Sequence, residues 1–218
     1  MSRRRRIVEF VVAAAALVAL MPLMAVVAAL IWLDSGGPVL FRQKRMGGNG
    51  REFTLCKFRS MRKARDRNSC ITVSGDSRIT RVGAFLRRYK LDELPQFWNV
   101  LRGDMSLVGP RPKLPHLEPL HMTYRPGITG AATLAFRNEE EFLAGIPEVE
   151  VEAFYEMFVK PAKAQLDFDY MRRATFLSDI AILSQTLTSC VSSPPQSVTL
   201  AAEVVARYAA EWNGATAS

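Results

Sequence analysis

The chain has 218 residues, of which 49% are hydrophobic and 23% are charged, and its net charge is +8. This length is sufficient for one domain with a real core, and the composition is too apolar for a disordered tail. Three cysteines are too few for a disulfide scaffold. A single long apolar run also excludes a transporter or transferase that crosses the membrane many times.

The apolar run covers residues 7–33 and is interrupted only by Glu9 and Pro22. It is longer than the core of a secretory signal peptide, and residues 34–37 make a poor cleavage site. A straight helix of this length crosses a bilayer, and the arginines at 3–6 would then place the body outside the cell. Pro22 removes a helical hydrogen bond near the middle, so the run could instead return to the side it entered. The residues alone fit both topologies.

Charge is unevenly distributed along the chain. Residues 41–90 hold 15 Lys and Arg against 3 acids, whereas residues 138–160 hold seven Glu and one Lys. A basic block next to an apolar run indicates anionic lipid, phosphorylated substrates or nucleic acid, although a solvated charged face is the plainer interpretation.

The three cysteines, Cys56, Cys70 and Cys190, are widely spaced and form no CxxC pair. With only two histidines in the chain, they predict no zinc or haem site. Unpaired thiols fit a reducing compartment, which favours a cytoplasmic body.

After the apolar run, the pattern predicts a hairpin over residues 39–59 with its turn at Gly48-Asn49-Gly50. Helical spacing then predicts one helix from Thr80 and a second from Asp92 to Leu101. The remaining predicted segments are a loop at 62–78, extended or turn-rich chain at 109–115 and 124–130, helices within the acidic stretch at 138–160 and within 150–188, a linker at 192–195 and an amphipathic helix at 198–212. The predicted fold is therefore α+β and mainly helical.

The sequence contains few candidate catalytic residues. Asp92 and Glu93 stand side by side at a predicted helix start. The plainer interpretation makes Asp92 a helix N-cap, worth about 1 kcal/mol. Alternatively, two carboxylates about 100° apart on a helix can divide two roles, one facing a metal and a phosphorus centre, the other an incoming hydroxyl or phosphate.

Nearby cations could neutralise phosphate oxygens, for which the guanidinium fork is well suited. These cations are Lys57, Arg59, Arg87, Arg88 and Arg111. The chain has no GxGxxG or P-loop signature, so a Rossmann or Walker nucleotide site is unsupported.

Four segments occur in an order that resembles the bacterial sugar transferases, the small monotopic phosphoglycosyl transferases. They are Lys-Phe-Arg-Ser-Met-Arg at 57–62, Leu-Asp-Glu-Leu-Pro-Gln-Phe-Trp-Asn-Val-Leu at 91–101, Gly-Asp-Met-Ser-Leu-Val-Gly-Pro-Arg-Pro at 103–112 and Arg-Pro-Gly-Ile-Thr-Gly at 125–130. The resemblance covers about residues 7–190.

The resemblance implies an enzyme that moves a sugar-1-phosphate from a UDP-sugar to undecaprenyl phosphate with Mg²⁺, releasing UMP. Glycan assembly at the cytoplasmic face of the bacterial inner membrane begins with this step. The resemblance makes Asp92 the nucleophile and a metal ligand, Glu93 its catalytic neighbour, and Arg87 and Arg111 substrate-binding residues. Pro22 becomes the break in a re-entrant helix. Lys57 and Arg59 are expected to bind substrate as well.

The implied domains are residues 1–35 for the membrane hairpin, 36–190 for a small α/β catalytic domain with amphipathic surface helices, and 191–218 for a linker and amphipathic helix. That last helix could pack on the core, on a second copy in a homodimer, or on the membrane. The chain departs from the family pattern at three places. Met21 stands where a serine is common, so a hydrogen bond that helps the helix break is missing. Tyr89-Lys90 stands where small hydroxyl residues are usual, and residues 131–136 differ from the usual continuation, which leaves the donor sugar open.

Two other functions compete with the enzyme. A membrane-tethered binder of anionic lipid or nucleic acid would use the basic block, but aromatic residues are sparse there and no nucleic-acid-binding motif occurs. A catalytically dead scaffold is disfavoured by the intact Asp92-Glu93 pair. We therefore expect no nucleic-acid partner.

Overall fold

The computed structural model describes residues 3–62, 76–115, 124–147 and 149–191. The predicted C-terminal helix at 198–212 and most of the predicted loop at 62–78 lie outside the described residues. The described part is mainly helical, with two small two-stranded sheets. This confirms the α+β class predicted from the sequence.

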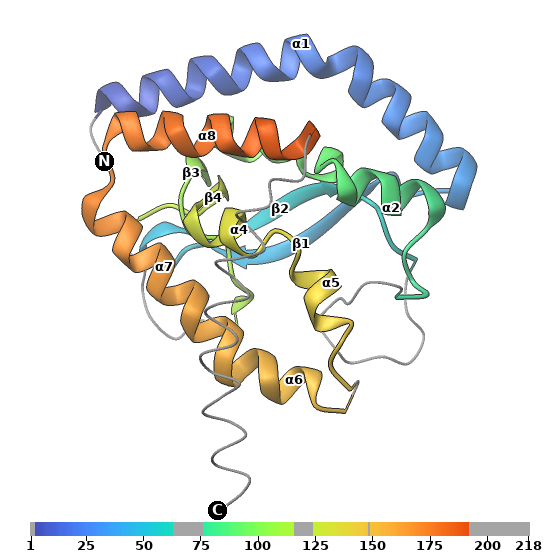
Figure 1. Cartoon of the computed structure of the whole chain (residues 1–218). Coiled ribbons are helices and arrows are strands. Elements are labelled where there is room, and N and C mark those ends of the chain that lie inside the picture. The colour runs from blue at the N-terminus through green and yellow to red at the C-terminus, as the bar shows by residue number, and fades with distance from the viewer. Residues whose placement is uncertain (1–2, 63–75, 116–123, 148, 192–218) are drawn as a thin grey trace, which may run out of the picture.

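The apolar run forms one long helix, α1 (Arg3–Ser35), with Pro22 inside it. The helix bends in its middle and runs across the top of the molecule (Figure 1). It is therefore a bent but continuous helix at Pro22, without a turn between two separate helices. By length and composition it is apolar enough to cross a membrane. Near its C-terminal end Val27 and Ile31 are buried against Phe58 and Leu86.

The predicted hairpin is confirmed. Strands β1 (Leu40–Met46) and β2 (Glu52–Phe58) pair antiparallel, with Leu40 opposite Phe58 and Met46 opposite Glu52. The turn η1 (Gly48–Gly50) places Asn49 and Gly50 at positive φ, which explains the Gly-Asn-Gly sequence. Phe53 and Leu55 of β2 alternate with more exposed neighbours and are buried in the central core, whereas Phe58 at the end of the strand is buried in a second cluster, against α1 and α2.

Both predicted helices are present, but the second begins at Gln96, four residues later than predicted. Helix α2 (Arg81–Arg88) begins after Thr80, whose hydroxyl accepts a hydrogen bond from the Gly83 N–H at 2.9 Å. Helix α3 (Gln96–Arg102) ends at Gly103, which adopts the left-handed conformation at φ 91°. The short 3-10 turn η2 (Leu91–Glu93) connects the two helices.

Strands β3 (Ser106–Val108) and β4 (Gly127–Thr129) pair in parallel, Ser106 with Gly127 and Val108 with Thr129. The sequence predicted only extended or turn-rich chain here, because three-residue strands are too short to show alternation. A Cβ on Gly127 would lie 2.1 Å from the Gly109 nitrogen, so these two segments approach too closely for a side chain.

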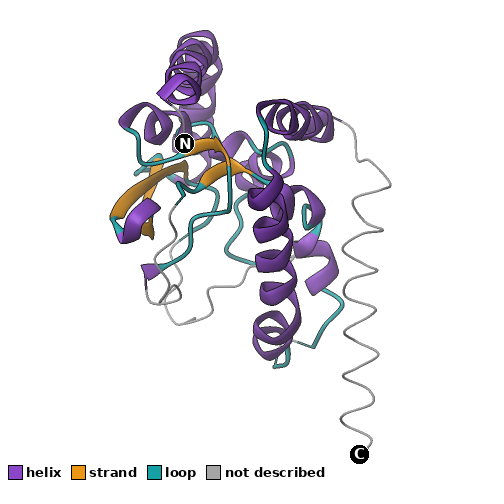
Figure 2. Cartoon of the chain, turned by 90° about the vertical axis from the view of Figure 1, so that its left-hand side faces the viewer, coloured by secondary structure: helices purple, strands orange, loops and turns teal. Residues whose placement is uncertain are grey.

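The C-terminal part is helical, as predicted. Its elements are α4 (Ala131–Ala135), α5 (Glu139–Leu143), α6 (Val151–Phe154), the π-helical turn η4 (Tyr155–Val159), α7 (Lys160–Arg173) and α8 (Phe176–Val191). The strands lie between the layer of α1 and α8 and the helices α5, α6 and α7 below (Figures 1 and 2). The central core contains Ala13 of α1, Leu55 of β2, Val100 of α3, Val108 of β3 and Ile182 of α8.

Candidate active site

The two candidate carboxylates lie in the turn between α2 and α3. Lys90 takes the left-handed conformation at φ 57°, which ends α2 and turns the chain into η2. Pro95 then begins α3. Asp92 lies inside this turn and caps no helix, so the plainer interpretation of Asp92 as an N-cap is wrong. Pro95 has no N–H to donate to the Leu91 carbonyl, so η2 does not run on into α3 as one α-helix.

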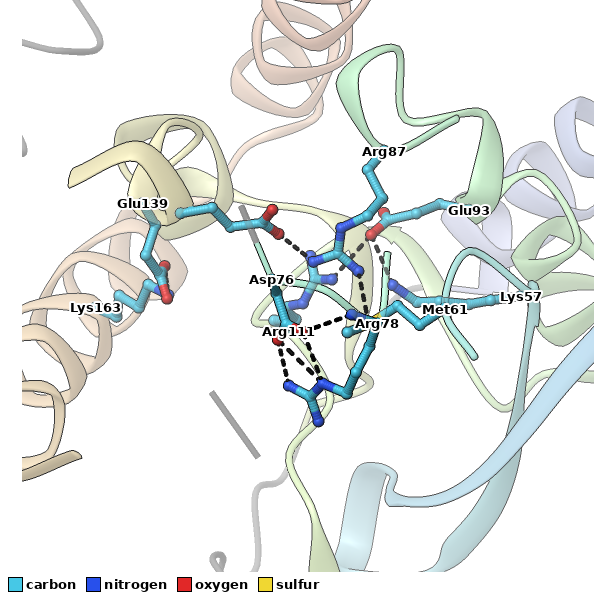
Figure 3. Close-up of polar contacts among 10 residues, drawn as sticks. Lys57, Met61, Asp76, Arg78, Arg87, Glu93, Arg111, Glu139 and Lys163 are labelled. Atoms are coloured by element: carbon cyan, nitrogen blue, oxygen red, sulfur yellow. Dashed lines mark hydrogen bonds and ion pairs between the residues drawn. The ribbon is translucent and has the colours of Figure 1, made fainter. Parts of the chain in front are cut away.

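Both carboxylates are withdrawn from solvent, yet their surroundings differ. Asp92 is 5% exposed and Glu93 is 7% exposed. Glu93 Oε1 accepts a hydrogen bond from Lys57 Nζ at 2.8 Å and another from Arg111 Nη2 at 2.9 Å (Figure 3). Asp92 Oδ1, in contrast, is buried and has no hydrogen-bond partner among the described residues. A buried, unpartnered carboxylate oxygen marks a position that a ligand can fill.

These surroundings move the two pKa values apart. Burial raises the pKa of Asp92, and the charge of Lys57 opposes that rise. Burial also disfavours the charged form of Glu93, but Lys57 and Arg111 together outweigh it and hold the pKa of Glu93 below its usual range. Glu93 is therefore a fixed anion, while Asp92 is the carboxylate whose protonation state can change. A split of this kind typically separates catalytic roles.

The predicted cations come from different elements. Lys57 lies near the end of β2, Arg87 lies in the last turn of α2, and Arg111 follows β3. Lys57 and Arg111 converge on Glu93, and the charge of Arg87 acts on Asp92. The tertiary fold thus brings together five of the predicted residues from four separate segments; Figure 3 shows four of them, Lys57, Arg87, Glu93 and Arg111.

Arg59 is engaged elsewhere. Its guanidinium donates to the Ser35 and Gly37 carbonyls at 3.0 and 2.8 Å, and also to the Gly36 carbonyl. These are the orphan carbonyls that follow the last turn of α1, which a cation stabilises. Arg59 therefore binds the C-terminal end of α1 and does not contact the residues around Glu93. Pro22 lies inside α1.

The sequence predicted helix in the acidic stretch but not that its helix α5 lies beside the site. Glu140 of α5 forms an ion pair with Arg87, and Glu139 forms one with Lys163 of α7. Lys163 Nζ also lies over the rings of Phe136 and Tyr155, at 5.4 and 5.3 Å. The strongly acidic stretch at 138–160 was visible in the sequence, and its complementarity to the basic block was the available signal.

The residues present fit a divalent cation of the Mg²⁺ type. Within the described ranges, no three His, Cys, Asp or Glu side chains form a ready cation cage. Mg²⁺ does not need one, because it binds through one or two carboxylates together with substrate phosphates and water. The buried, unpartnered Asp92 Oδ1 offers a carboxylate of that kind.

With this geometry established, comparison with known proteins decides the family. The bacterial sugar transferase family model matches residues 1–193. The chain belongs to the bacterial sugar transferase family.

Three relatives illustrate the range of this family. A UDP-glucose:undecaprenyl-phosphate glucose-1-phosphate transferase of Xanthomonas campestris pv. campestris is 43% identical over 189 residues, 81% of this chain and 36% of that protein. A protein of the same name from Caulobacter vibrioides is 37% identical, over 87% of this chain and 70% of its own length. A UDP-N-acetylgalactosamine-undecaprenyl-phosphate N-acetylgalactosaminephosphotransferase of Aeromonas hydrophila is 35% identical, over 78% and 40%.

The chain thus spans about two fifths of the Xanthomonas and Aeromonas proteins. The names of the relatives specify two different sugars on one lipid acceptor.

Proposed function

We propose that this chain is a phosphoglycosyl transferase that moves a sugar-1-phosphate from a UDP-sugar to undecaprenyl phosphate, with Mg²⁺, as the membrane step that begins a glycan. The observation that carries the proposal is the buried, unpartnered Asp92 Oδ1 beside a Glu93 that two cations hold ionised. Family membership and the names of the relatives support it.

The proposed chemistry has two displacements at one phosphorus atom. A carboxylate oxygen of Asp92 forms a bond to the phosphorus that bears the sugar, and the bond from that phosphorus to the UMP oxygen breaks, so that UMP leaves with the electron pair. An oxygen of the lipid phosphate then attacks the same phosphorus and releases Asp92. Splitting one transfer into two displacements is the usual gain from a covalent intermediate.

The other site residues would bind and orient the substrates. Arg111 and Arg87 are placed to neutralise oxygens of the donor diphosphate, and Lys57 keeps Glu93 ionised beside the reacting group. Asp92 would hold Mg²⁺, whose positive charge would offset the negative charge of the phosphate groups. Glu93 then either assists the incoming lipid phosphate or positions the metal.

The proposed topology is a re-entrant α1 with both ends on the cytoplasmic side. At the N-terminal end, Arg5 forms an ion pair with Asp179 of α8 at 2.5 Å. At the other end, Arg59 of the body binds the Ser35 carbonyl. One body contacts both ends, so a straight spanning helix, which separates its ends by the bilayer, would lose one of these contacts. The contacts at both ends of α1 therefore favour the re-entrant alternative.

Surface helices would complete the membrane attachment. Large apolar side chains are exposed on α1, and also on α2, α3 and α8, which lie on the α1 side of the molecule (Figure 1). Among them are Phe85 and Tyr89 of α2, Trp98 of α3, and Leu177, Ile180 and Leu187 of α8. Trp98 is 53% exposed. An interfacial position in the inner leaflet accounts for these side chains, because amphipathic helices bury such a face among lipids.

The test is to isolate the covalent intermediate. Purified full-length protein incubated with a UDP-sugar and Mg²⁺, without lipid, should release UMP in an amount no greater than that of enzyme and carry a phosphosugar adduct in intact mass analysis. Asp92→Asn removes the anionic nucleophile with little change of volume, so the adduct should disappear and turnover should fall at least a thousandfold.

Because Asp92 caps no helix and makes no hydrogen bond through Oδ1, Asp92→Asn should leave the unfolding temperature nearly unchanged. An adduct on another residue, or full turnover by Asp92→Asn, would overturn the assignment. A panel of UDP-sugars in the same assay identifies the donor.

A further inference from the structure

Arg87, one of the cations of the proposed site, forms an ion pair with Glu140 of α5. Arg87 is 22% exposed in its side chain and Glu140 is 37% exposed. The pair between Lys57 and Glu93 is much more deeply enclosed, at 16% and 9%. Partly exposed ion pairs contribute little net stability, because water solvates the separated charges well. The contact between Arg87 and Glu140 is therefore inexpensive to break.

A second observation shows that the Arg87 guanidinium is only partly satisfied. Its Nε is buried and has no hydrogen-bond partner among the described residues. Its Nη1 lies 3.7 Å from the Met61 sulfur, which is a weak acceptor. A guanidinium can make two parallel hydrogen bonds to phosphate oxygens, and such pairs are the strong ones. Arg87 therefore has unused donor capacity next to Asp92, whose pKa its charge lowers.

We infer that Glu140 is a displaceable latch, a carboxylate that holds Arg87 until the diphosphate of the donor replaces it. This inference rests on the proposed function and deepens it by assigning α5 a role in donor binding. A diphosphate carries more negative charge and more acceptor oxygens than one carboxylate, so it competes well for the same guanidinium. Once displaced, Glu140 is repelled by the bound diphosphate.

Helix α5 makes two ion pairs, Glu140 with Arg87 and Glu139 with Lys163, and the first is the weaker. It spans only Glu139–Leu143, and Leu143 anchors it in a small cluster with Ala135, Phe136 and Val159. Glu139 holds Lys163 of α7, where the cation also lies over two aromatic rings. The Glu139 contact is thus reinforced from several sides, whereas the Glu140 contact is an ion pair alone. Donor binding should free the Arg87 side of α5 and leave the α7 side attached.

The experiment measures the affinity for UDP, used as the probe, by calorimetry on the full-length protein. Glu140→Gln removes the competing charge and should tighten UDP binding about three- to fivefold, the range expected for a partly exposed ion pair. Glu139→Gln makes the same charge change on the same helix, but it breaks the contact with Lys163. It should change UDP affinity by less than about twofold.

The decisive control is the Arg87→Ala background. In that background Glu140 has no guanidinium to hold, so adding Glu140→Gln should leave the UDP affinity unchanged. An equal gain in that background would show a general charge effect and overturn the latch. Unchanged or weaker UDP binding by Glu140→Gln alone would also overturn it, because Glu140 would then hold Arg87 in its productive orientation.

The two proposals fail separately. If wild-type protein releases UMP from a UDP-sugar and the UDP affinities do not follow this pattern, only the latch is wrong. If the UDP affinities of the variants change as expected but no UDP-sugar yields UMP or an adduct, Glu140 is still a latch at a nucleotide-binding site. Only the proposed transfer is then wrong.

Discussion

Asp92 and Glu93 are adjacent in the chain, but the cations around them act mainly on one of the pair. Lys57 and Arg111 both donate to Glu93 Oε1, and their charges hold the pKa of Glu93 below its usual range. Asp92 receives no such bond at Oδ1, and burial raises its pKa. Lys57 has a second effect, because its charge also opposes the rise at Asp92. This lysine therefore controls the pH at which Asp92 is ionised.

Replacing Lys57 by methionine should therefore change the pH profile of the enzyme. Asp92 must be ionised to attack, so activity is present above its pKa and is lost as pH falls through it. Without Lys57 the pKa of Asp92 rises further, and the acid limb of kcat/KM should move to higher pH by about one unit. Lys57→Arg keeps the charge and should leave the limb close to its original position.

Lys44→Met is the matched control, because Lys44 belongs to the same hairpin but pairs with the exposed Glu52. It should leave the profile unchanged. A Lys57→Met enzyme that loses the same factor in rate at every pH would contradict the electrostatic role and indicate a direct contact between Lys57 and the substrate.

Among the elements, those with a clear local signal were predictable from the sequence. The Gly-Asn-Gly turn gave the hairpin, and Thr80 gave the start of α2. The parallel pair β3 and β4 was missed, since its partners are about 20 residues apart and each has three residues. The separate turn at Asp92 was also missed, because the positive φ of Lys90 is a conformation that its residue type does not favour.

Helix α2 depends on a close approach that only glycine permits. A Cβ on Gly83 would lie 2.0 Å from the Ser60 carbonyl oxygen, which also accepts a hydrogen bond from the Thr80 N–H at 3.1 Å. Alanine gains up to about 1 kcal/mol in helix propensity over glycine. Overpacking against a fixed backbone atom costs about 1–3 kcal/mol, so the clash dominates.

We expect Gly83→Ala to lower the free energy of unfolding and the unfolding temperature by several degrees, measured in detergent. Donor binding should weaken too, because α2 carries Arg87. Gly145→Ala is the control, since the nearest atom to its Cβ would be the Phe142 carbonyl oxygen at 3.5 Å, an ordinary contact. Equal stability of the two variants would show that α2 moves away from Ser60 without cost.

At the scale of the whole molecule, α1 and the body form one unit. Ala13 of α1 is fully buried in the central core, and Val27 and Ile31 are buried in a second cluster with Phe58 and Leu86. The sequence identified the apolar run and its proline but left two topologies open, because hydropathy does not show which residues of a helix contact protein. Glu9, which interrupts the run, is buried and lies 3.7 Å from the Arg5 Nε. That contact explains how an acid is tolerated there.

The re-entrant topology predicts that tags at residue 1 and residue 218 lie on the same, cytoplasmic side in whole cells. Pro22→Leu restores a helical hydrogen bond in the middle of α1 and favours a straighter helix. Straightening separates Arg5 from Asp179 or Ser35 from Arg59, so we expect part of the population to place its two tags on opposite sides. Transfer activity should fall by the same fraction, since a body on the outer side does not meet the nucleotide donor.

Met21→Leu changes the neighbouring exposed apolar residue and keeps the proline, so its tags and activity should match wild type. Tags on opposite sides in the wild-type chain would contradict the re-entrant topology, whatever the outcome for Pro22→Leu.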